Sequence, residues 1–298
     1  MYQFEEIISP KSPFNFDIML EVTQMFYPTQ DSFRKINGSL VYGYNLDDQL
    51  VIISLKPLEE ENSLLRLRFL SEKELTQEQI KLLKTAVYRR FSLDMDLDIF
   101  YNLMANDPVM EPVLSYLNGY HPVSFSSLEE TVLWALISQR TPMPLARKQK
   151  HSVMELASHH LHIKDLDFIG FPSLQQLVAI SHEDWMTTIG IEKKVTYIQS
   201  FIQAMCQRQT DFFSDDYDHQ YRFLKDCYGI GDWTAEFAIV RSGANFSKVP
   251  WSEKANRDTF TKYYGPTASR ENLEAHYGNY AGLWIHYLRI YDYLTRIH

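Results

Sequence analysis

A Gly-Ile-Gly turn between two helical patterns is the feature that most constrains this chain. The turn occupies residues 229–231, after a helical pattern that runs up to Tyr228 and before a second helix that opens at once. Glycines let the backbone reverse without Cβ clashes and let another backbone approach closely. The amides of the turn and of the new helix start have no partners within the helix, so they form a positive cradle that suits a phosphate. An ordinary interhelical turn with a glycine cap is the alternative.

Composition limits the class of protein. The chain has 298 residues, of which 45% are hydrophobic and 14% aromatic, and this is enough for two compact domains with ordinary cores. The longest apolar runs are too short to span a bilayer, so no membrane association is expected. Residues 1–6 lack a basic start and an apolar signal core, so a cytoplasmic location is expected.

The periodicity changes near residue 100. Apolar runs at 39–44 and 49–55 and an alternating run at 64–69 predict strands. A helix is predicted from Thr76, where Gln79 completes a capping box. Beyond residue 93 only helical patterns follow, among them one opened by a second capping box at 127–130. The sequence therefore predicts an α+β N-terminal domain, 1–100, followed by an all-α domain, 101–298, with a helix-hairpin-helix at about 218–242.

The string Tyr-Gly-Ile-Gly-Asp-Trp-Thr-Ala at 228–235 is far more specific than two glycines. It resembles the hairpin of the helix-hairpin-helix DNA glycosylase superfamily, and the Trp after the turn resembles the DNA-3-methyladenine glycosylase II branch. Residues 135–141 and 13–17 are similar to further segments of that family. The resemblance implies a monomer that binds double-stranded DNA containing damaged bases. The residues it implies at the DNA are Gly229, Gly231, Thr234, Gln139 and Arg140.

The same resemblance implies cleavage of the bond between base and sugar in base excision repair. The transition state is oxocarbenium-like, so a carboxylate is needed beside the sugar. Asp258 is the preferred candidate, because the segment from 258 to 265 looks like the family's Asp-headed helix. Counting from Pro250 gives Ser252 or Glu253 instead. Glu253 and a loss of catalysis therefore remain as alternatives, and so does a simple capping role for Asp258.

Trp233 and Phe237 are four residues apart and so share one face of the hairpin's second helix. By spacing alone they would be core, whereas the resemblance makes them walls of a base pocket, with Phe16, Tyr287 and Tyr291 as weaker candidates. Bifunctional relatives carry a Lys where this chain has Trp233, so the resemblance implies a monofunctional enzyme acting on damaged, alkylated purines. A non-catalytic DNA-binding protein and an oxidised-purine glycosylase are the alternatives.

Charge and the residues available as metal ligands further limit the partners and cofactors that are expected. The net charge of −9 is unusual for a DNA-binding protein. Basic residues nevertheless gather near the turns, at positions 140, 147, 148, 150, 193, 194, 248, 254 and 257. Two cysteines are too few for a four-thiolate iron–sulfur cluster. No metal-ligand spacing is present, and the histidines at 159–162 are expected on a helix end at the surface. A monovalent cation on the hairpin carbonyls is possible in this superfamily.

Overall fold

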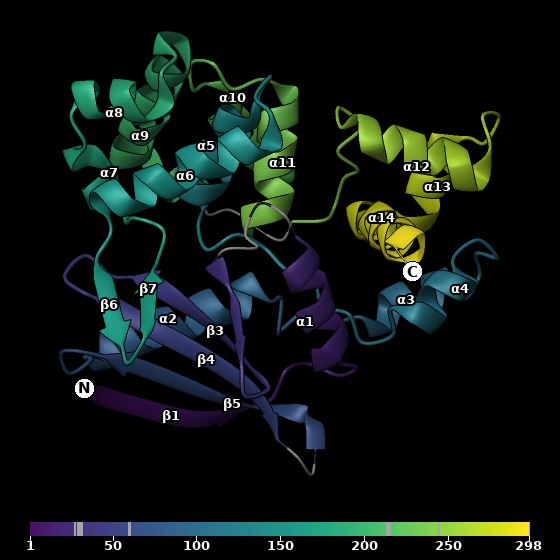
Figure 1. Ribbon diagram of the computed structural model, residues 1–298. Coiled ribbons are helices and arrows are strands. Elements are labelled where there is room, and N and C mark those ends of the chain that lie inside the picture. Colours follow the sequence, from purple (N-terminus) through teal and green to yellow (C-terminus); the bar gives the residue numbers. More distant parts are fainter. Residues whose placement is uncertain (27, 29–31, 59–60, 213–215, 244, 298) are drawn as a thin grey trace.

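An antiparallel sheet forms the first part of the computed structural model, which describes residues 1–26, 28, 32–58, 61–212, 216–243 and 245–297. The sheet has the order β1-β5-β4-β3-β2 and lies below the helices in Figure 1. Its strands are β1 (Tyr2–Ile8), β2 (Arg34–Ile36), β3 (Ser39–Asn45), β4 (Leu50–Leu58) and β5 (Glu61–Ser71). The three predicted strands are confirmed as β3, β4 and β5.

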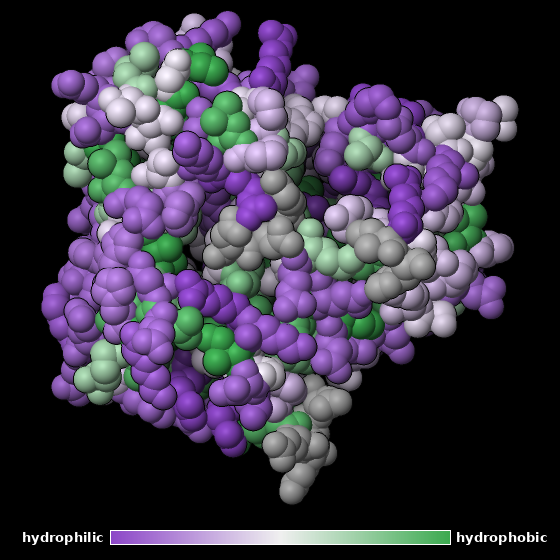
Figure 2. Space-filling view, in the orientation of Figure 1, coloured by the Kyte–Doolittle hydropathy of each residue, from purple (hydrophilic) through white to green (hydrophobic). Residues whose placement is uncertain are grey.

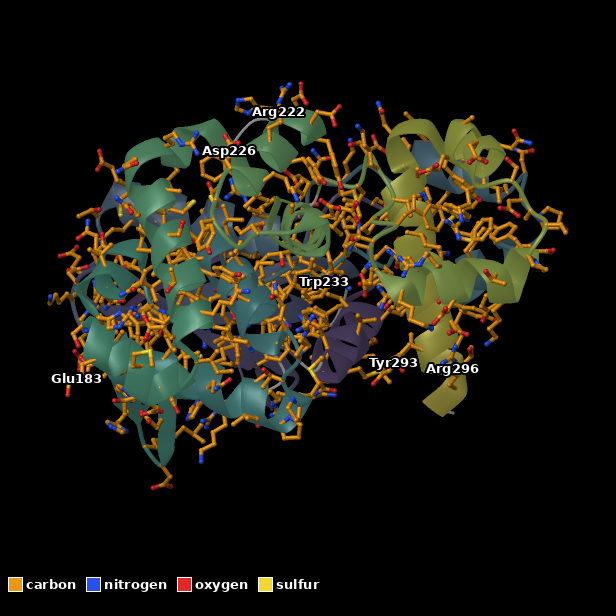
Figure 3. All side chains as sticks on the ribbon, turned by 90° about the horizontal axis from the view of Figure 1, so that it is seen from above. Glu183, Arg222, Asp226, Trp233, Tyr293 and Arg296 are labelled. Atoms are coloured by element: carbon orange, nitrogen blue, oxygen red, sulfur yellow. The ribbon has the colours of Figure 1, made fainter. Side chains whose placement is uncertain are left out.

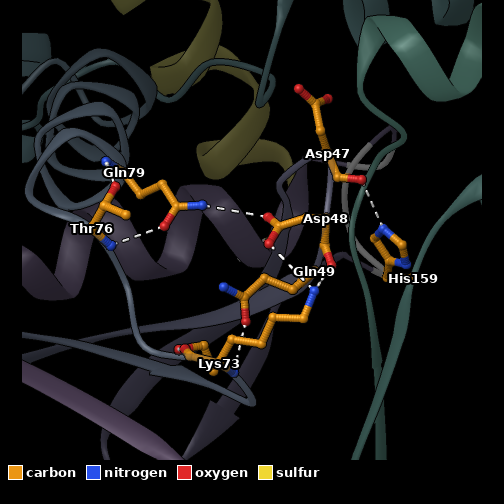
Figure 4. A network of polar contacts seen from close by, with 8 residues as sticks. Asp47, Asp48, Gln49, Lys73, Thr76, Gln79 and His159 are labelled. Atoms are coloured by element: carbon orange, nitrogen blue, oxygen red, sulfur yellow. Dashed lines mark hydrogen bonds and ion pairs between the residues drawn. The ribbon is translucent and has the colours of Figure 1, made fainter.

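The helix that covers this sheet is α2 (Gln77–Arg90). The predicted capping box is confirmed, because Thr76 and Gln79 exchange hydrogen bonds of 2.9 and 3.2 Å (Figure 4). Gln79 also reaches Asp48 in the turn between β3 and β4. The neighbouring carbonyl of Asp47 meets the Nε2 atom of His159, which belongs to the second half of the chain, at 3.1 Å. This turn therefore joins the two halves of the molecule.

The second half is helical, as predicted, apart from one hairpin. Strands β6 (His160–Ile163) and β7 (Leu166–Ile169) pair with each other and lie against β3 and β4 of the sheet. The contact is close, since a Cβ atom at Gly43 would lie 2.6 Å from the carbonyl oxygen of Ile169. The histidines at 159–162 thus lie on and beside a strand and not on a helix end, so that prediction was wrong.

The helices of this half form two groups in Figure 1. The main body includes the helix α5, which begins after Ser127. Ser127 accepts a hydrogen bond from the amide of Glu130, but the predicted return bond is missing because the Glu130 carboxylate binds Lys150 and Ser126 instead. The body contains α5 (Leu128–Ser138), α6 (Met143–Ala157), α7 (Leu174–Ala179), α8 (His182–Ile189), α9 (Glu192–Phe212), α10 (Tyr217–Lys225) and α11 (Asp232–Gly243).

A separate lobe stands beside this body in Figure 1. Its core joins residues from near position 100 with residues from the end of the chain, for example Phe100 and Trp284. No helix among the described residues is both long enough and apolar enough to cross a membrane. The lobe contains α3 (Asp98–Met104), α4 (Glu111–Tyr116), α12 (Lys254–Tyr264), α13 (Arg270–Tyr277), the short 3-10 turn η2 (Gly278–Tyr280) and α14 (Ala281–Ile297).

Helix α1 (Phe16–Met25) lies where the three parts meet. Met19 belongs to the core under the sheet, Val22 belongs to the core of the lobe, and Phe26, just after the helix, packs on the core of the main body. On the face drawn in Figure 2, hydrophilic residues dominate and apolar ones appear as separate small groups. Scattered exposed apolar residues of this kind are usual for a folded protein.

Candidate functional site

The two glycines of the hairpin turn differ in how much space surrounds them. Only the first has no room for a side chain. Gly229 has a φ of +90°, and a Cβ atom there would lie 2.1 Å from the ring of Tyr197. Gly231 is exposed, and a Cβ atom there would have no heavy atom within 4 Å. Helix α11 begins at the next residue, as predicted. The start of α11 thus follows an exposed glycine with free space beside it, and a helix N-terminus in such a position suits an anion.

The residues expected at DNA lie together around this turn. Gln139, which follows α5, donates from Nε2 to the Oγ1 atom of Thr234 at 3.1 Å. Thr234 is 1% exposed, so its hydroxyl serves to hold Gln139 in place. Arg140 comes next, exposed and with a φ of +51°. One hydrogen bond thus joins the end of α5 to the start of α11 and places Arg140 beside the hairpin.

Some of the basic residues near the turns are not surface charges. The Nζ atom of Lys194 donates to the Ile137 carbonyl and to Thr141, both at 2.5 Å, and burial lowers the pKa of Lys194. Lys150 is buried against Glu130. These two lysines of the predicted basic group are therefore buried: Lys194 holds the end of α5, and Lys150 pairs with Glu130 and the carbonyl of Pro28. Lys194 supports the end of α5 that carries Gln139.

An aromatic wall lies beside the hairpin. The rings of Trp233 and Phe237 stack with centroids 5.3 Å apart at 23°, and Phe237 meets the edge of Phe125. Trp233 is partly exposed and lies at the centre of Figure 3, between the hairpin side and the α12–α14 lobe. Phe16 and Tyr287 are buried in the core under the sheet and in the core of the lobe, whereas Phe237 packs on the core of the main body.

The two candidate carboxylates lie at different places on helix α12. Helix α12 begins at Lys254, and Glu253 is its N-cap residue. Asp258 lies one turn further along, where its side chain is 59% exposed and pairs with Lys254. The prediction that Asp258 opens the helix was wrong. The turn forms earlier because Asn256 donates to the carbonyl of Pro250 at 2.8 Å, which fixes the chain reversal just ahead of Glu253.

Glu253 faces the interface between the body and the lobe. Its Oε1 atom lies 2.7 Å from a guanidinium nitrogen of Arg289 on α14, and Arg289 also donates to Asn256 at 3.0 Å. A cavity of about 20 Å³ adjoins the pair, which is room for about one water molecule. Ten residues line it: Phe237, Val240, Arg241, Pro250, Glu253, Asn256, Gly282, Ile285, His286 and Arg289.

Two further titratable groups of the cavity are shifted by burial. Burial lowers the pKa of the Arg241 guanidinium, and the charge of Arg289 acts in the same direction. Burial also holds the pKa of His286 well below its usual range, with the charges of Arg241 and Arg289 adding to the effect. His286 is therefore neutral at pH 7, and its Nε2 atom lies 3.1 Å from the hydroxyl of Tyr120. The charged groups left around the cavity are Glu253 and the two arginines.

Metal binding finds no support among the side chains that the structure describes, where no group of three or more His, Cys, Asp or Glu is arranged to hold an ion. His160 and His162 pair with Asp167, and His160 also approaches Glu155. Both ring nitrogens of His160 and the Nδ1 atom of His162 thus have carboxylate neighbours.

Comparison with known proteins identifies the fold. No family model matches the chain. Over 158 residues it is 21% identical to a DNA-3-methyladenine glycosylase of Bacillus subtilis (strain 168), a match that covers 52% of each protein, so the chain aligns with about half the length of this curated relative. A 3-methyladenine DNA-glycosylase from Archaeoglobus fulgidus superposes with a TM-score of 0.77 at 18% identity over 99% of both chains. The chain has the fold of the helix-hairpin-helix DNA glycosylases.

A second helix-hairpin-helix glycosylase has the same layout. The 8-oxoguanine glycosylase/lyase of Clostridium acetobutylicum, in complex with double-stranded DNA, superposes with a TM-score of 0.65 at 14% identity over 89% of this chain and 98% of the other. The resemblance inferred from residues 228–235 is therefore confirmed for the fold, including the sheet that precedes the helical part. The superposition on the Archaeoglobus fulgidus structure covers 99% of this chain and so extends over both the hairpin and the lobe that carries Glu253.

Proposed function

We propose that this protein is a monofunctional DNA glycosylase that hydrolyses the bond between a damaged purine and its deoxyribose in double-stranded DNA, with Glu253 as the carboxylate. One observation carries the proposal: Glu253 lines the same cavity as Phe237, whose ring stacks on Trp233. A carboxylate and an aromatic wall thus meet beside a hairpin whose open amides suit a phosphate. Extrusion of the base costs a few kcal/mol, and stacking offsets part of that cost.

The mechanism follows from charge. As the bond to the base breaks, positive charge develops on the sugar, and the Glu253 carboxylate stabilises it. The same carboxylate can take a proton from an attacking water, and the adjoining cavity has room for about one. Arg289 orients the carboxylate through its 2.7 Å contact. Trp233 is not an amine, so no Schiff base forms at that position and the abasic strand stays intact.

Alkylated purines are the proposed substrates. A purine alkylated on the ring is cationic, leaves readily and stacks well on electron-rich rings, so an aromatic wall and one carboxylate suffice. Oxidised purines are the second candidate, favoured by the likeness in fold to the Clostridium acetobutylicum 8-oxoguanine enzyme. Duplexes with 3-methyladenine, hypoxanthine or 8-oxoguanine, treated with alkali after incubation, would separate the two.

The test of the proposal compares two carboxylates. Glu253→Gln keeps the side chain's size but removes its charge, and single-turnover excision should fall about 100- to 1,000-fold, as for other single groups that stabilise transition-state charge. Asp258→Asn is the matched control, because Asp258 is exposed and paired only with Lys254, and its rate should stay within a few-fold of the parent. A slow Asp258→Asn beside a fast Glu253→Gln would reverse the assignment. A parent inactive on every lesion would favour a non-catalytic DNA-binding protein.

A further inference from the structure

Glu236 is a second carboxylate on the site face of the hairpin helix. It lies three residues after Trp233 and one before Phe237, so all three side chains share one side of α11. Its Oε2 atom accepts a hydrogen bond from the amide of Ser252 at 3.0 Å and another from the Ser252 hydroxyl at 2.5 Å. Burial raises the pKa of Glu236, although both bonds from Ser252 oppose the rise.

These bonds cross from the main body to the lobe. Ser252 directly precedes Glu253, so its amide belongs to the turn that carries the proposed catalytic carboxylate. On the lobe side, Arg289 holds Glu253 itself and the indole of Trp251 donates to Glu274 on α13 at 2.9 Å. On the hairpin side, Glu236 holds the same turn through its two hydrogen bonds from Ser252.

We infer that Glu236 is a positioning residue that ties the turn bearing Glu253 to the helix that grips DNA. The inference rests on the proposed function. Gly231, at the proposed phosphate cradle, directly precedes α11, and Glu236 lies five residues later on that helix, so the same helix follows the cradle and holds the Ser252 amide. Placement of the reacting carboxylate is then set by the same element that captures the DNA.

Two substitutions at this position distinguish positioning from proton donation. Glu236→Gln keeps an oxygen that accepts both bonds from Ser252 but cannot act as an acid, so single-turnover excision should stay within about 3-fold of the parent. Glu236→Ala frees the turn and should slow excision about 10- to 100-fold, the scale of a misplaced catalytic group. Binding to abasic-site DNA should be unchanged in both. Ser252→Ala, which removes one of the two bonds, should lie between parent and Glu236→Ala.

Controls make the outcomes separable. Glu271→Ala removes an exposed carboxylate of the same lobe and should match the parent. Adding Glu236→Ala to Glu253→Gln should cause no further loss, because Glu236 acts through Glu253. If Glu236→Gln is as slow as Glu236→Ala and the alkaline limb of the pH–rate profile disappears, Glu236 is a proton donor and the positioning role is overturned. If Glu236→Ala excises as fast as the parent while Glu253→Gln is inactive, only the inference about Glu236 is overturned. If Glu253→Gln is fully active, the proposed function is overturned.

Discussion

Whether the pair Trp233 and Phe237 forms a pocket wall or part of a core depends on Trp233. Its spacing from Phe237 fits a core position equally well, and the sequence alone offers no way to choose. In the structure Trp233 is only partly covered, and its stacking on Phe237 leaves it at the boundary between the body and the lobe. A residue that completes a core would be enclosed, as Trp185 and Trp284 are.

Replacing Trp233 with alanine tests its role in the pocket. If the indole stacks on an extruded base, Trp233→Ala should lose about 1–3 kcal/mol of transition-state stabilisation, measured as single-turnover excision. Binding to abasic-site DNA should change little, because that DNA has no base to stack. Phe212→Ala, in the core of the main body, is the contrasting variant and should lower the melting temperature. Equal losses of excision and abasic-site binding in Trp233→Ala, with a lowered melting temperature, would make the indole part of the core.

The carboxylate shows the limit of residue-level prediction. Asp258 is the sequence-based candidate because residues 258–265 resemble a helix that begins with Asp, yet α12 starts at Lys254. The hydrogen bond from Asn256 to the carbonyl of Pro250 fixes the earlier start of the helix. The side chain of Glu253 is held by Arg289, which is 36 positions away in the sequence. Contacts at such separations leave no local pattern. The signal that was available was the count from Pro250, which pointed to Ser252 and Glu253.

At the scale of elements, the hairpin was predictable because its information is local. The turn needs a glycine at 229, and helix α11 follows directly. Strands β3 to β5 were likewise predictable from local apolar runs, the last of them alternating, and the cap of α2 from a four-residue motif. Hairpin β6–β7 was missed because its strands have four residues each, which is too short for a periodic signal, and because its position depends on the close approach at Gly43.

The two glycines of the hairpin turn should separate folding from DNA binding. Gly229→Ala places a Cβ atom into the ring of Tyr197 at a positive φ, so the protein should lose about 1–3 kcal/mol of stability, measured by denaturant unfolding. A Cβ atom at Gly231 would have no heavy atom within 4 Å, so the melting temperature of Gly231→Val should stay close to that of the parent. Its side chain stands where a phosphate would approach, and binding to damaged and undamaged duplexes should weaken together. A Gly231→Val protein that binds abasic-site DNA as tightly as the parent would show that DNA is held elsewhere.

At the scale of the whole molecule, three cores meet at α1, and the proposed site lies where the body and the lobe face each other. The net charge of −9 does not oppose this arrangement, because a hairpin that uses backbone amides needs few side-chain charges. Several basic residues are already paired within the protein, Lys248 with Asp218 and Lys254 with Asp258 among them. The attraction to DNA is therefore expected to depend only modestly on salt.

A buried carboxylate in the lobe should make the free energy of unfolding depend on pH. Asp292 on α14 is 6% exposed and pairs with Lys262 of α12 and with Arg296. Burial opposes its ionisation, but the hydrogen bonds from Lys262 and Tyr263 outweigh burial, so its pKa is lowered from the ordinary 3.8. A carboxyl with a depressed pKa contributes stability that is present above the unfolded-state value and is lost as the pH falls through the folded-state value.

This stability should therefore be complete above about pH 5 and should decline below about pH 4. Asp292→Asn should lose about 1–3 kcal/mol at pH 7, the scale of hydrogen bonds to a charged group. Its unfolding free energy should then approach that of the parent as the pH is lowered toward 3, because the parent loses the same contribution by protonation. Asp258→Asn, which changes an exposed pair, should run parallel to the parent throughout. If the Asp292→Asn and parent curves from urea unfolding stayed equally far apart from pH 7 to pH 3, the join between α12 and α14 would not depend on the ionised carboxylate.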